Sequence, residues 1–143
     1  MGSSPVNRED GPALRVVMMP RDTNPQGTVF GGILLSYIDQ AGAVAAREYQ
    51  PHRFVTVAMD KVEFKQPVFV GDVLSFYAQV VKVGRTSLTI HVSVESQRFA
   101  DPREVVPVTE AELVYVAVNE KREPVPVGTP LGQGGKDARS EAN

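Results

Sequence analysis

The sequence predicts an α+β fold in which one long helix is covered by an antiparallel sheet of about five strands. The segment 30–48 has helical composition and is apolar on nearly every side, as buried helices are. The segments before and after it alternate between apolar and polar residues, as strands with one buried face do. Valine, which favours sheet, occurs 24 times against 7 leucines and 3 isoleucines.

The predicted strands lie on both sides of this helix in a simple order. One strand precedes the helix and ends at Pro20, and four strands follow it, separated by short turns rich in glycine, proline and aspartate. The alternation is clearest from Leu88 to Glu95. Because short turns join antiparallel neighbours, the strands form one sheet that covers the helix. The predicted strands are residues 13–19, 53–65, 72–83, 86–99 and 105–118.

Both ends of the 143-residue chain differ in composition from its middle. Residues 1–12 are polar with two prolines, and residues 119–143 are rich in proline, glycine and charged side chains. Such segments rarely become ordered unless they dock on a folded domain. We therefore expect a disordered arm over residues 1–12, one domain over residues 13–118 and a loose tail over residues 119–143.

Composition and charge argue against several classes of function. The chain has no cysteine, which removes thiolate nucleophiles and thiolate metal sites, and its two histidines are too few for a histidine metal centre. A net charge of −2 argues against a nucleic-acid-binding face. No apolar run is long enough for a transmembrane helix, and the N-terminus lacks the apolar region of a signal peptide. We expect a cytoplasmic protein with no metal, no membrane insertion and no nucleic-acid partner.

One acidic residue stands in the middle of the apolar helix. Asp39 is flanked by apolar positions, and a carboxylate there is costly unless it is paired or used in chemistry, for instance as a general base. Gly31 and Gly32 precede it at the helix start, where free N–H groups can polarise a carbonyl, and Thr28 is a candidate N-cap. The alternatives are a solvent-facing Asp39 and glycines that only permit tight packing.

Three stretches of the chain, in this order, point to a known family: MPRDTNPQGTVFGGILLSYIDQAGAVAAR, VTVAMDKVEFKQPVFVGDVL and KVGRTS. They resemble the hotdog-fold acyl-CoA thioesterases, and most closely the bacterial cytosolic acyl-CoA hydrolases. The most specific part is the pattern N-x-x-G-x-x-F-G-G with an aspartate seven residues beyond its last glycine. The resemblance covers about residues 13–118 and implies a long helix wrapped by an antiparallel sheet.

The resemblance implies roles for four residues in acyl-CoA hydrolysis. Asp39 matches the carboxylate that acts as general base or as nucleophile, and Asn24 matches a residue that orients the catalytic water or the carboxylate. The N–H of Gly32 would hold the thioester oxygen, and Thr56 matches a strand residue that faces the site from the partner subunit. At position 28, where relatives carry Asp or Asn, this chain has Thr28.

The resemblance also implies a binding turn, a substrate and an assembly. Gly84, Arg85, Thr86 and Ser87 match the turn that contacts the nucleotide end of coenzyme A, although Arg85 could simply be an exposed turn residue. Coenzyme A is part of the substrate, so no separate cofactor is expected. The implied assembly is a homodimer with sites at its interface, further assembled as a trimer of dimers, and the implied setting is fatty acid metabolism.

Two other functions fit the same fold. The chain could be a non-catalytic module that binds acyl-CoA, although such modules usually need an output domain, for which residues 1–12 are too short. It could also be a hydratase or dehydratase, but that chemistry needs a positioned histidine, and neither His52 nor His91 lies in a matching motif.

Overall fold

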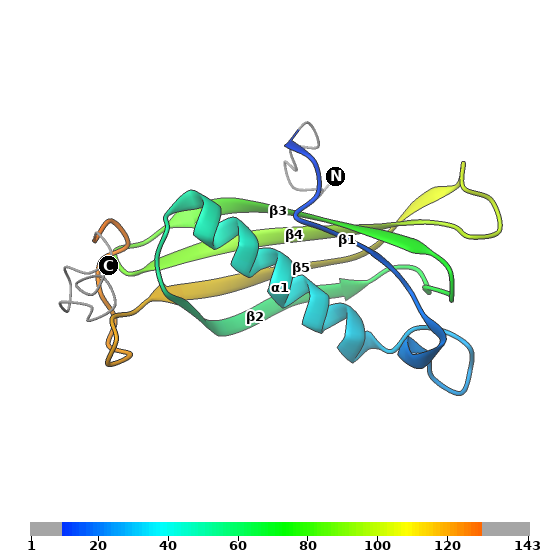
Figure 1. The fold of residues 1–143 in the computed structure, drawn as a ribbon, viewed down its shortest axis with the longest axis horizontal. Helices are drawn as coiled ribbons and strands as arrows, with labels where there is room; N and C mark the ends of the chain where they lie inside the picture. The colour runs from blue at the N-terminus through cyan, green and yellow to red at the C-terminus, as the bar shows by residue number, and fades with distance from the viewer. Residues whose placement is uncertain (1–9, 130–143) are drawn as a thin grey trace, which may run out of the picture.

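The computed structural model describes residues 10–129, in which one helix lies across one face of a five-stranded antiparallel sheet (Figure 1). The α+β architecture predicted from the sequence is confirmed, and each predicted element agrees with the observed one within one or two residues. The elements are β1 (Leu14–Val17), the 3-10 turn η2 (Pro20–Asp22), α1 (Gly31–Tyr49), β2 (Phe54–Phe64), β3 (Val73–Val83), β4 (Ser87–Gln97) and β5 (Val105–Ala117).

The strand order β1-β3-β4-β5-β2 places the first two strands of the chain at the two edges of the sheet. β1 is short and pairs only with Val73–Phe76 of β3. β2 has 11 residues and pairs with β5 on one side. Within the part of the chain that the structure describes, its other side has no strand partner, so β2 presents a long open edge.

The core lies between α1 and the inner face of the sheet. Leu34, Ile38 and Ala46 of the helix pack against the inward-facing residues of β4 and β5, which include Leu88 and Leu113. The expectation that α1 is buried on nearly every side is wrong, because one sheet covers only one face of a helix, and Ala43 and Tyr49 remain exposed. Among residues 10–129, no helix is long and apolar enough to cross a membrane.

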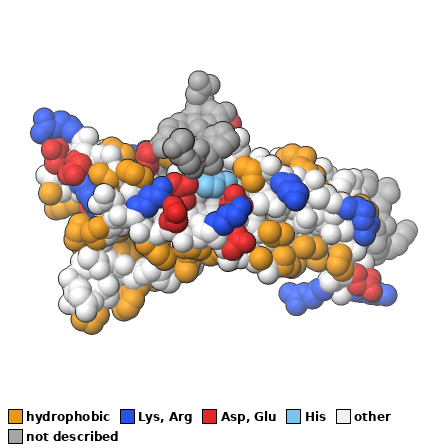
Figure 2. All heavy atoms as spheres, turned by 180° about the vertical axis from the view of Figure 1, so that it is seen from behind, with side chains coloured by type: hydrophobic (Ala, Val, Ile, Leu, Met, Phe, Trp, Pro, Cys, Tyr) orange, Lys and Arg blue, Asp and Glu red, His pale blue; other side chains and the backbone are white. Residues whose placement is uncertain are grey.

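The outer face of the sheet carries charges of both signs (Figure 2). Glu110 forms an ion pair with Lys65, and its Oε1 lies 3.2 Å from His91 Nε2. Lys61 and Glu112 form a further ion pair at 3.3 Å. Since these side chains alternate along the strands with the core residues, His91 points away from α1.

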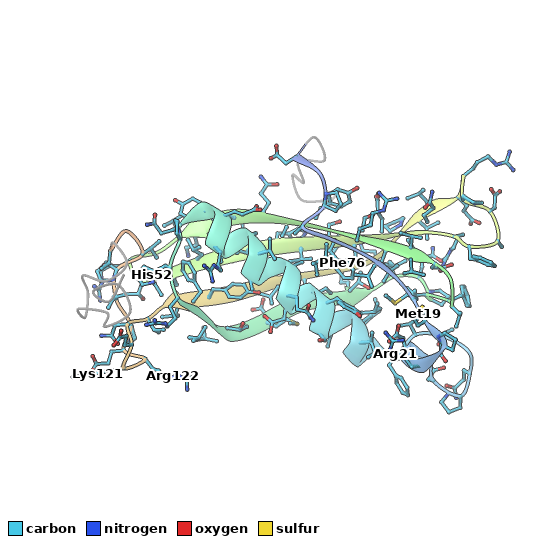
Figure 3. All side chains as sticks on the ribbon, in the orientation of Figure 1. Met19, Arg21, His52, Phe76, Lys121 and Arg122 are labelled. Carbon is cyan, nitrogen blue, oxygen red and sulfur yellow. The ribbon has the colours of Figure 1, made fainter. Side chains whose placement is uncertain are left out.

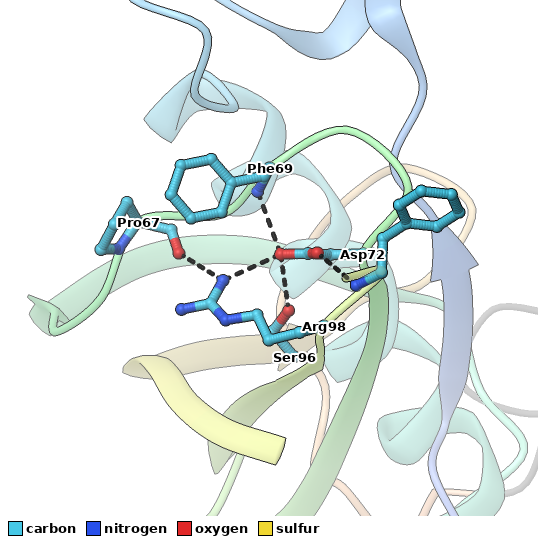
Figure 4. A network of polar contacts seen from close by, with 6 residues as sticks. Pro67, Phe69, Asp72, Ser96 and Arg98 are labelled. Carbon is cyan, nitrogen blue, oxygen red and sulfur yellow. Dashed lines mark hydrogen bonds and ion pairs between the residues drawn. The ribbon is translucent and has the colours of Figure 1, made fainter. Parts of the chain in front are cut away.

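A buried carboxylate holds the loop between β2 and β3 against the end of β4 (Figure 4). Asp72 is 2% exposed and accepts hydrogen bonds from the backbone N–H groups of Phe69 and Phe99, from Ser96 Oγ and from Arg98 Nη1 at 2.8 Å. Burial alone would raise the pKa of Asp72, but these hydrogen bonds outweigh it and hold the pKa below its ordinary value of 3.8. The same guanidinium donates to the carbonyl of Pro67, so Asp72 and Arg98 fix three segments together.

The segment 119–129 is docked, contrary to the expectation of a loose tail. Asn119 Oδ1 accepts hydrogen bonds from two backbone N–H groups and closes a turn, after which Val125 N–H bonds to the Ala117 carbonyl. Val127 N–H then bonds to the Arg85 carbonyl at 2.8 Å, and both valine side chains are buried. The expected arm lies mostly in residues 1–9 and the rest of the expected tail in residues 130–143, both outside the described residues.

Candidate active site

The carboxylate of Asp39 is held by two hydroxyl groups from the sheet. Thr56 Oγ1 donates a hydrogen bond to Asp39 Oδ1 at 2.8 Å, and Tyr115 Oη lies 3.0 Å from the same oxygen. Tyr115 Oη also lies 2.8 Å from the backbone carbonyl of Asp39, so its single proton is shared between two acceptors on one residue. The carboxylate is therefore fixed from β2 and from β5.

The pairing of β2 with β5 explains why both hydroxyls reach the same oxygen. Thr56 and Tyr115 stand directly opposite each other in the ladder, and cross-strand neighbours on one face lie close enough for their side chains to meet a common partner. The register shifts at the next residue, Val57, which is 56% exposed. Such a bulge locally re-aims side chains, and it lies directly beside the candidate site.

The Tyr115 ring can pack against the backbone of α1 because the helix residue at the point of contact is a glycine, Gly42. A Cβ at Gly42 would lie 2.2 Å from Tyr115 Oη and 2.9 Å from two of its ring carbons, so no other residue fits there without displacing the ring. Burial, together with the nearby charge of Asp39 and the hydrogen bond to it, raises the pKa of Tyr115 far above its ordinary value of 10.0. Its hydroxyl is thus a stable donor.

The second carboxylate oxygen of Asp39 is open. Among residues 10–129, no side-chain or backbone group donates a hydrogen bond to Asp39 Oδ2. The residue is half-buried, so this oxygen can receive a proton or contact a ligand. Asp39 is therefore not fully exposed to solvent, and among the described residues it forms no ion pair.

The start of α1 offers free N–H groups. The N-cap residue is Phe30, which has no side-chain acceptor, so the expectation that Thr28 caps the helix is wrong. Among the described residues, no acceptor meets the N–H of Gly31 or Gly32. A Cβ at Gly32 would meet no atom within 4 Å, so tight packing within the chain does not explain this glycine. These N–H groups, at the positive end of the helix dipole, can bind a carbonyl oxygen.

Asn24 organises the loop that leads to this helix start. Its Oδ1 accepts hydrogen bonds from the backbone N–H groups of Gln26 and Thr28, and its Nδ2 donates to Thr28 Oγ1 at 2.9 Å. Asn24 makes no hydrogen bond to Asp39 of the same chain. Asn24 thus belongs to the loop that precedes Gly32, whereas Asp39 contacts Thr56.

These two groups do not meet within one chain. Seven residues separate Gly32 from Asp39, which corresponds to about 10 Å along a helix axis. The free N–H groups at a helix start also point out along the axis, away from the residues that follow. The resemblance implied that Thr56 faces the site from a partner subunit, but its hydroxyl lies on Asp39 of its own chain, so it belongs to the half of the site that holds the carboxylate.

The turn between β3 and β4 lies at the end of the molecule opposite to the start of α1 (Figure 1). In Figure 3, Met19 and Arg21 lie near the helix start, whereas His52, Lys121 and Arg122 lie at the other end. Within the turn, Gly84 N–H bonds to the Ser87 carbonyl, and the Thr86 carbonyl accepts from Ala117 N–H. The side chain of Arg85 is exposed, so it is available for an anion.

A shallow hollow of about 350 Å³ adjoins the helix start. Its walls include Val29, Gly31, Leu34 and Phe64, and the Phe64 ring would lie 3.4 Å from a Cβ on Gly31. The lining is mostly apolar. A carbonyl bound at the helix start would therefore have apolar surface beside it.

Histidine does not take part in this site. His91 lies on the outer face of the sheet, and His52, in the loop after α1, shares its Nδ1 with the backbone of Arg53. Across residues 10–129, no group of three or more His, Cys, Asp or Glu side chains is arranged to hold a metal ion.

Sequence reasoning missed Tyr115 and Gly42. Tyr115 lies in the last predicted strand, residues 105–118, at a position where the structure buries its side chain. A tyrosine at such a position usually needs a hydrogen-bond partner, and that requirement was the one available signal. Its partner lies 76 residues earlier in the chain, and only the folded sheet brings the two together.

Comparison with known proteins agrees with the fold. The model of the thioesterase superfamily matches residues 26–98. A chain described as an uncharacterized acyl-CoA thioester hydrolase of Zymomonas mobilis is 42% identical over 87% of this chain and 83% of its own length. The acyl-CoA thioester hydrolase YciA of Escherichia coli is 41% identical over 78% of this chain and 86% of its own.

Solved structures give the same result. The hexameric hotdog-fold thioesterase Cj0915 of Campylobacter jejuni superposes with a TM-score of 0.75 and is 50% identical, covering 80% of this chain and 88% of its own. Its fold is the hotdog fold that the motifs predicted. With this match, and with a family model that spans more than half of the sequence, the chain belongs to the thioesterase superfamily.

Proposed function

We propose that the protein hydrolyses acyl-CoA thioesters to a free carboxylic acid and coenzyme A. The observation that carries this proposal is the Asp39 carboxylate, which has one oxygen fixed by two hydroxyls and the other oxygen open. A thioester carbonyl is electrophilic, and a polarising dipole with one carboxylate suffices for its hydrolysis. The names of relatives from Zymomonas mobilis and Escherichia coli support the substrate class.

In the proposed reaction the thioester oxygen accepts a hydrogen bond from the free N–H of Gly32. This N–H stabilises the negative charge that develops on the oxygen when the carbonyl carbon is attacked. The C–S bond then breaks, and the electron pair leaves on the thiolate of coenzyme A, which is a good leaving group. Water supplies the oxygen of the new acid and the proton that the thiolate finally carries.

Asp39 assists the attack through its open oxygen. Either Oδ2 takes a proton from the attacking water, or it attacks the carbonyl itself and gives a mixed anhydride that water then hydrolyses. Both routes need the carboxylate to be held in place while its second oxygen remains accessible. Thr56 contributes by fixing Oδ1 at 2.8 Å.

The active site is composed of two copies of the chain. Gly32 and Asn24 of one copy face Asp39 and Thr56 of the other, because one chain holds these two groups about 10 Å apart along its helix. The open edge of β2 and the uncovered face of α1 are the surfaces that a second copy would cover. By similarity to the hexameric thioesterase of Campylobacter jejuni, three such dimers form a hexamer.

The acyl chain and the nucleotide of acyl-CoA bind outside the catalytic groups. The apolar hollow beside Gly31 gives the acyl chain a wall, and Arg85 in the β3–β4 turn meets the phosphates of the nucleotide. No cofactor beyond the substrate's own coenzyme A is assigned. A cytoplasmic location remains a prediction.

The alternative functions fit the site less well. A hydratase needs a histidine beside the carboxylate, whereas His91 lies on the opposite face of the sheet and His52 is bonded to the backbone beyond the helix. A pure binding module would have no use for an anchored carboxylate with a free oxygen.

The test is thiol release from a panel of acyl-CoAs of different chain length. The wild type should release coenzyme A, and Asp39→Asn should lose on the order of a hundredfold to ten-thousandfold in kcat. Asp101→Asn, an aspartate on the β4–β5 connection whose side chain is 43% exposed, is the control and should keep full activity. Absence of release from every substrate overturns the proposed function, and full activity in Asp39→Asn overturns the role of that residue.

A further inference from the structure

Resting on the proposed function, we infer that Tyr115 is a positioning residue that fixes the catalytic orientation of Asp39, and that Gly42 is required because it admits the Tyr115 ring to the helix. Tyr115 would not touch the substrate. It would act through the carboxylate, by holding Oδ1 so that Oδ2 alone faces the reacting atoms.

The contacts of the hydroxyl favour this role over ordinary core packing. Tyr115 is 1% exposed, and a buried hydroxyl needs a partner. Its donor reaches both the backbone carbonyl of Asp39 and the Oδ1 of the same residue, at 2.8 Å and 3.0 Å. These two contacts hold both the backbone and the carboxylate of Asp39 in place.

The helix shows a matching adaptation. Gly42 lies one turn beyond Asp39, and glycine in a helix interior is destabilising relative to alanine. The ring of Tyr115 occupies the space that a Cβ at this position would fill, at 2.2 Å from Oη. The helix thus carries a glycine at the position where the Tyr115 hydroxyl approaches the backbone of Asp39.

No charged group competes for the carboxylate. Among residues 10–129, no lysine, arginine or histidine forms an ion pair with Asp39. Thr56 from β2 and Tyr115 from β5 are its two side-chain partners. Removing one of them leaves a single side-chain donor on Oδ1, so the carboxylate loses part of what fixes its orientation.

The experiment compares wild type with Tyr115→Phe, which keeps the ring and removes only the hydroxyl. At neutral pH kcat for one acyl-CoA should fall roughly tenfold, as expected for the loss of one hydrogen bond to the carboxylate. KM should stay within twofold, because Tyr115 does not touch the substrate. The control is Tyr77→Phe, on the outer face of the sheet, which should leave both kcat and KM unchanged.

Gly42→Ala provides a second, independent variant, because it displaces the ring without removing the hydroxyl, and it should lower kcat with little change in KM. Thermal melts of each variant identify the folded ones, and the kinetic constants are read from those. Wild-type kcat in a folded Tyr115→Phe or Gly42→Ala overturns the positioning role. Failure of the wild type to release thiol would instead overturn the proposed function.

Discussion

Gly32 and Asp39 lie two turns apart on the same face of α1, and the N–H of Gly32 points away from the Asp39 carboxylate. The proposed function therefore predicts that each site takes its N–H from one copy and its carboxylate from another. This prediction can be tested without a structure of the assembly.

Complementation between two inactive variants tests the composite site. Gly32→Val places a branched side chain where a Cβ meets no atom of its own chain, so the variant should fold but block the free N–H groups. Coexpressed with Asp39→Asn, it should give mixed dimers in which one of two sites keeps both wild-type residues. Random pairing then restores about a quarter of wild-type thiol release.

The control for this experiment is each variant expressed alone, which should remain inactive. Absence of any recovery in mixed dimers, with mixing verified by differently tagged subunits, would show that both residues act within one chain.

Arg85 should contribute to binding rather than to the chemical step. Its exposed side chain follows Gly84 in the β3–β4 turn, and replacement by alanine should raise KM roughly threefold to tenfold with kcat little changed, since an exposed contact with a phosphate is partly screened by solvent. Steady-state kinetics at two salt concentrations measure both effects. Arg103→Ala, at the exposed β4–β5 connection, is the matched control. An unchanged KM in Arg85→Ala would reject the nucleotide contact.

Asp72 should matter for stability and not for catalysis. Asp72→Asn leaves Arg98 without its charged partner and should lower the free energy of unfolding by roughly 1.5–3 kcal/mol at neutral pH. The pKa of Asp72 is lower in the folded state than in the unfolded state. At pH values between these two pKa values, the unfolded state therefore binds more protons than the folded state. The stabilisation is therefore fully present above about pH 4 and is lost as pH falls through the folded-state pKa.

Urea unfolding of wild type and Asp72→Asn from pH 7 to pH 2 measures this difference, which should shrink below about pH 4. Asp60→Asn provides an exposed aspartate for comparison. A difference that stays constant over the whole range would mean that the Asp72 charge has no part in the stabilisation.

Much of the fold follows from local patterns in the sequence. The alternation from Leu88 to Glu95 fixes which face of β4 is buried, and the turns at Gly71 and Gly84 place the strand ends. The position of Asp39 on α1 follows in the same way. Each of these features depends on residues close together in the chain.

The errors arise where tertiary contacts decide the structure. Thr28 has the chemistry of an N-cap, but Asn24 engages its side chain and the helix begins two residues later. The composition of the segment 119–129 suggests a loose tail, yet the side chains of Val125 and Val127 are buried and their N–H groups form backbone hydrogen bonds. The contacts of Asp39 with Thr56 and Tyr115 could not be predicted without the register of β2 against β5.

That register links activity to the order in which the protein folds. The hydroxyls that hold Asp39 come from positions 17 and 76 residues later in the chain, and they adjoin each other only after β2 has paired with β5. Contacts between distant parts of a chain form slowly, because a long loop must close first. A refolding chain that has formed α1 and the β3–β4 hairpin would therefore remain inactive until the last strand of the sequence has docked between its two neighbours.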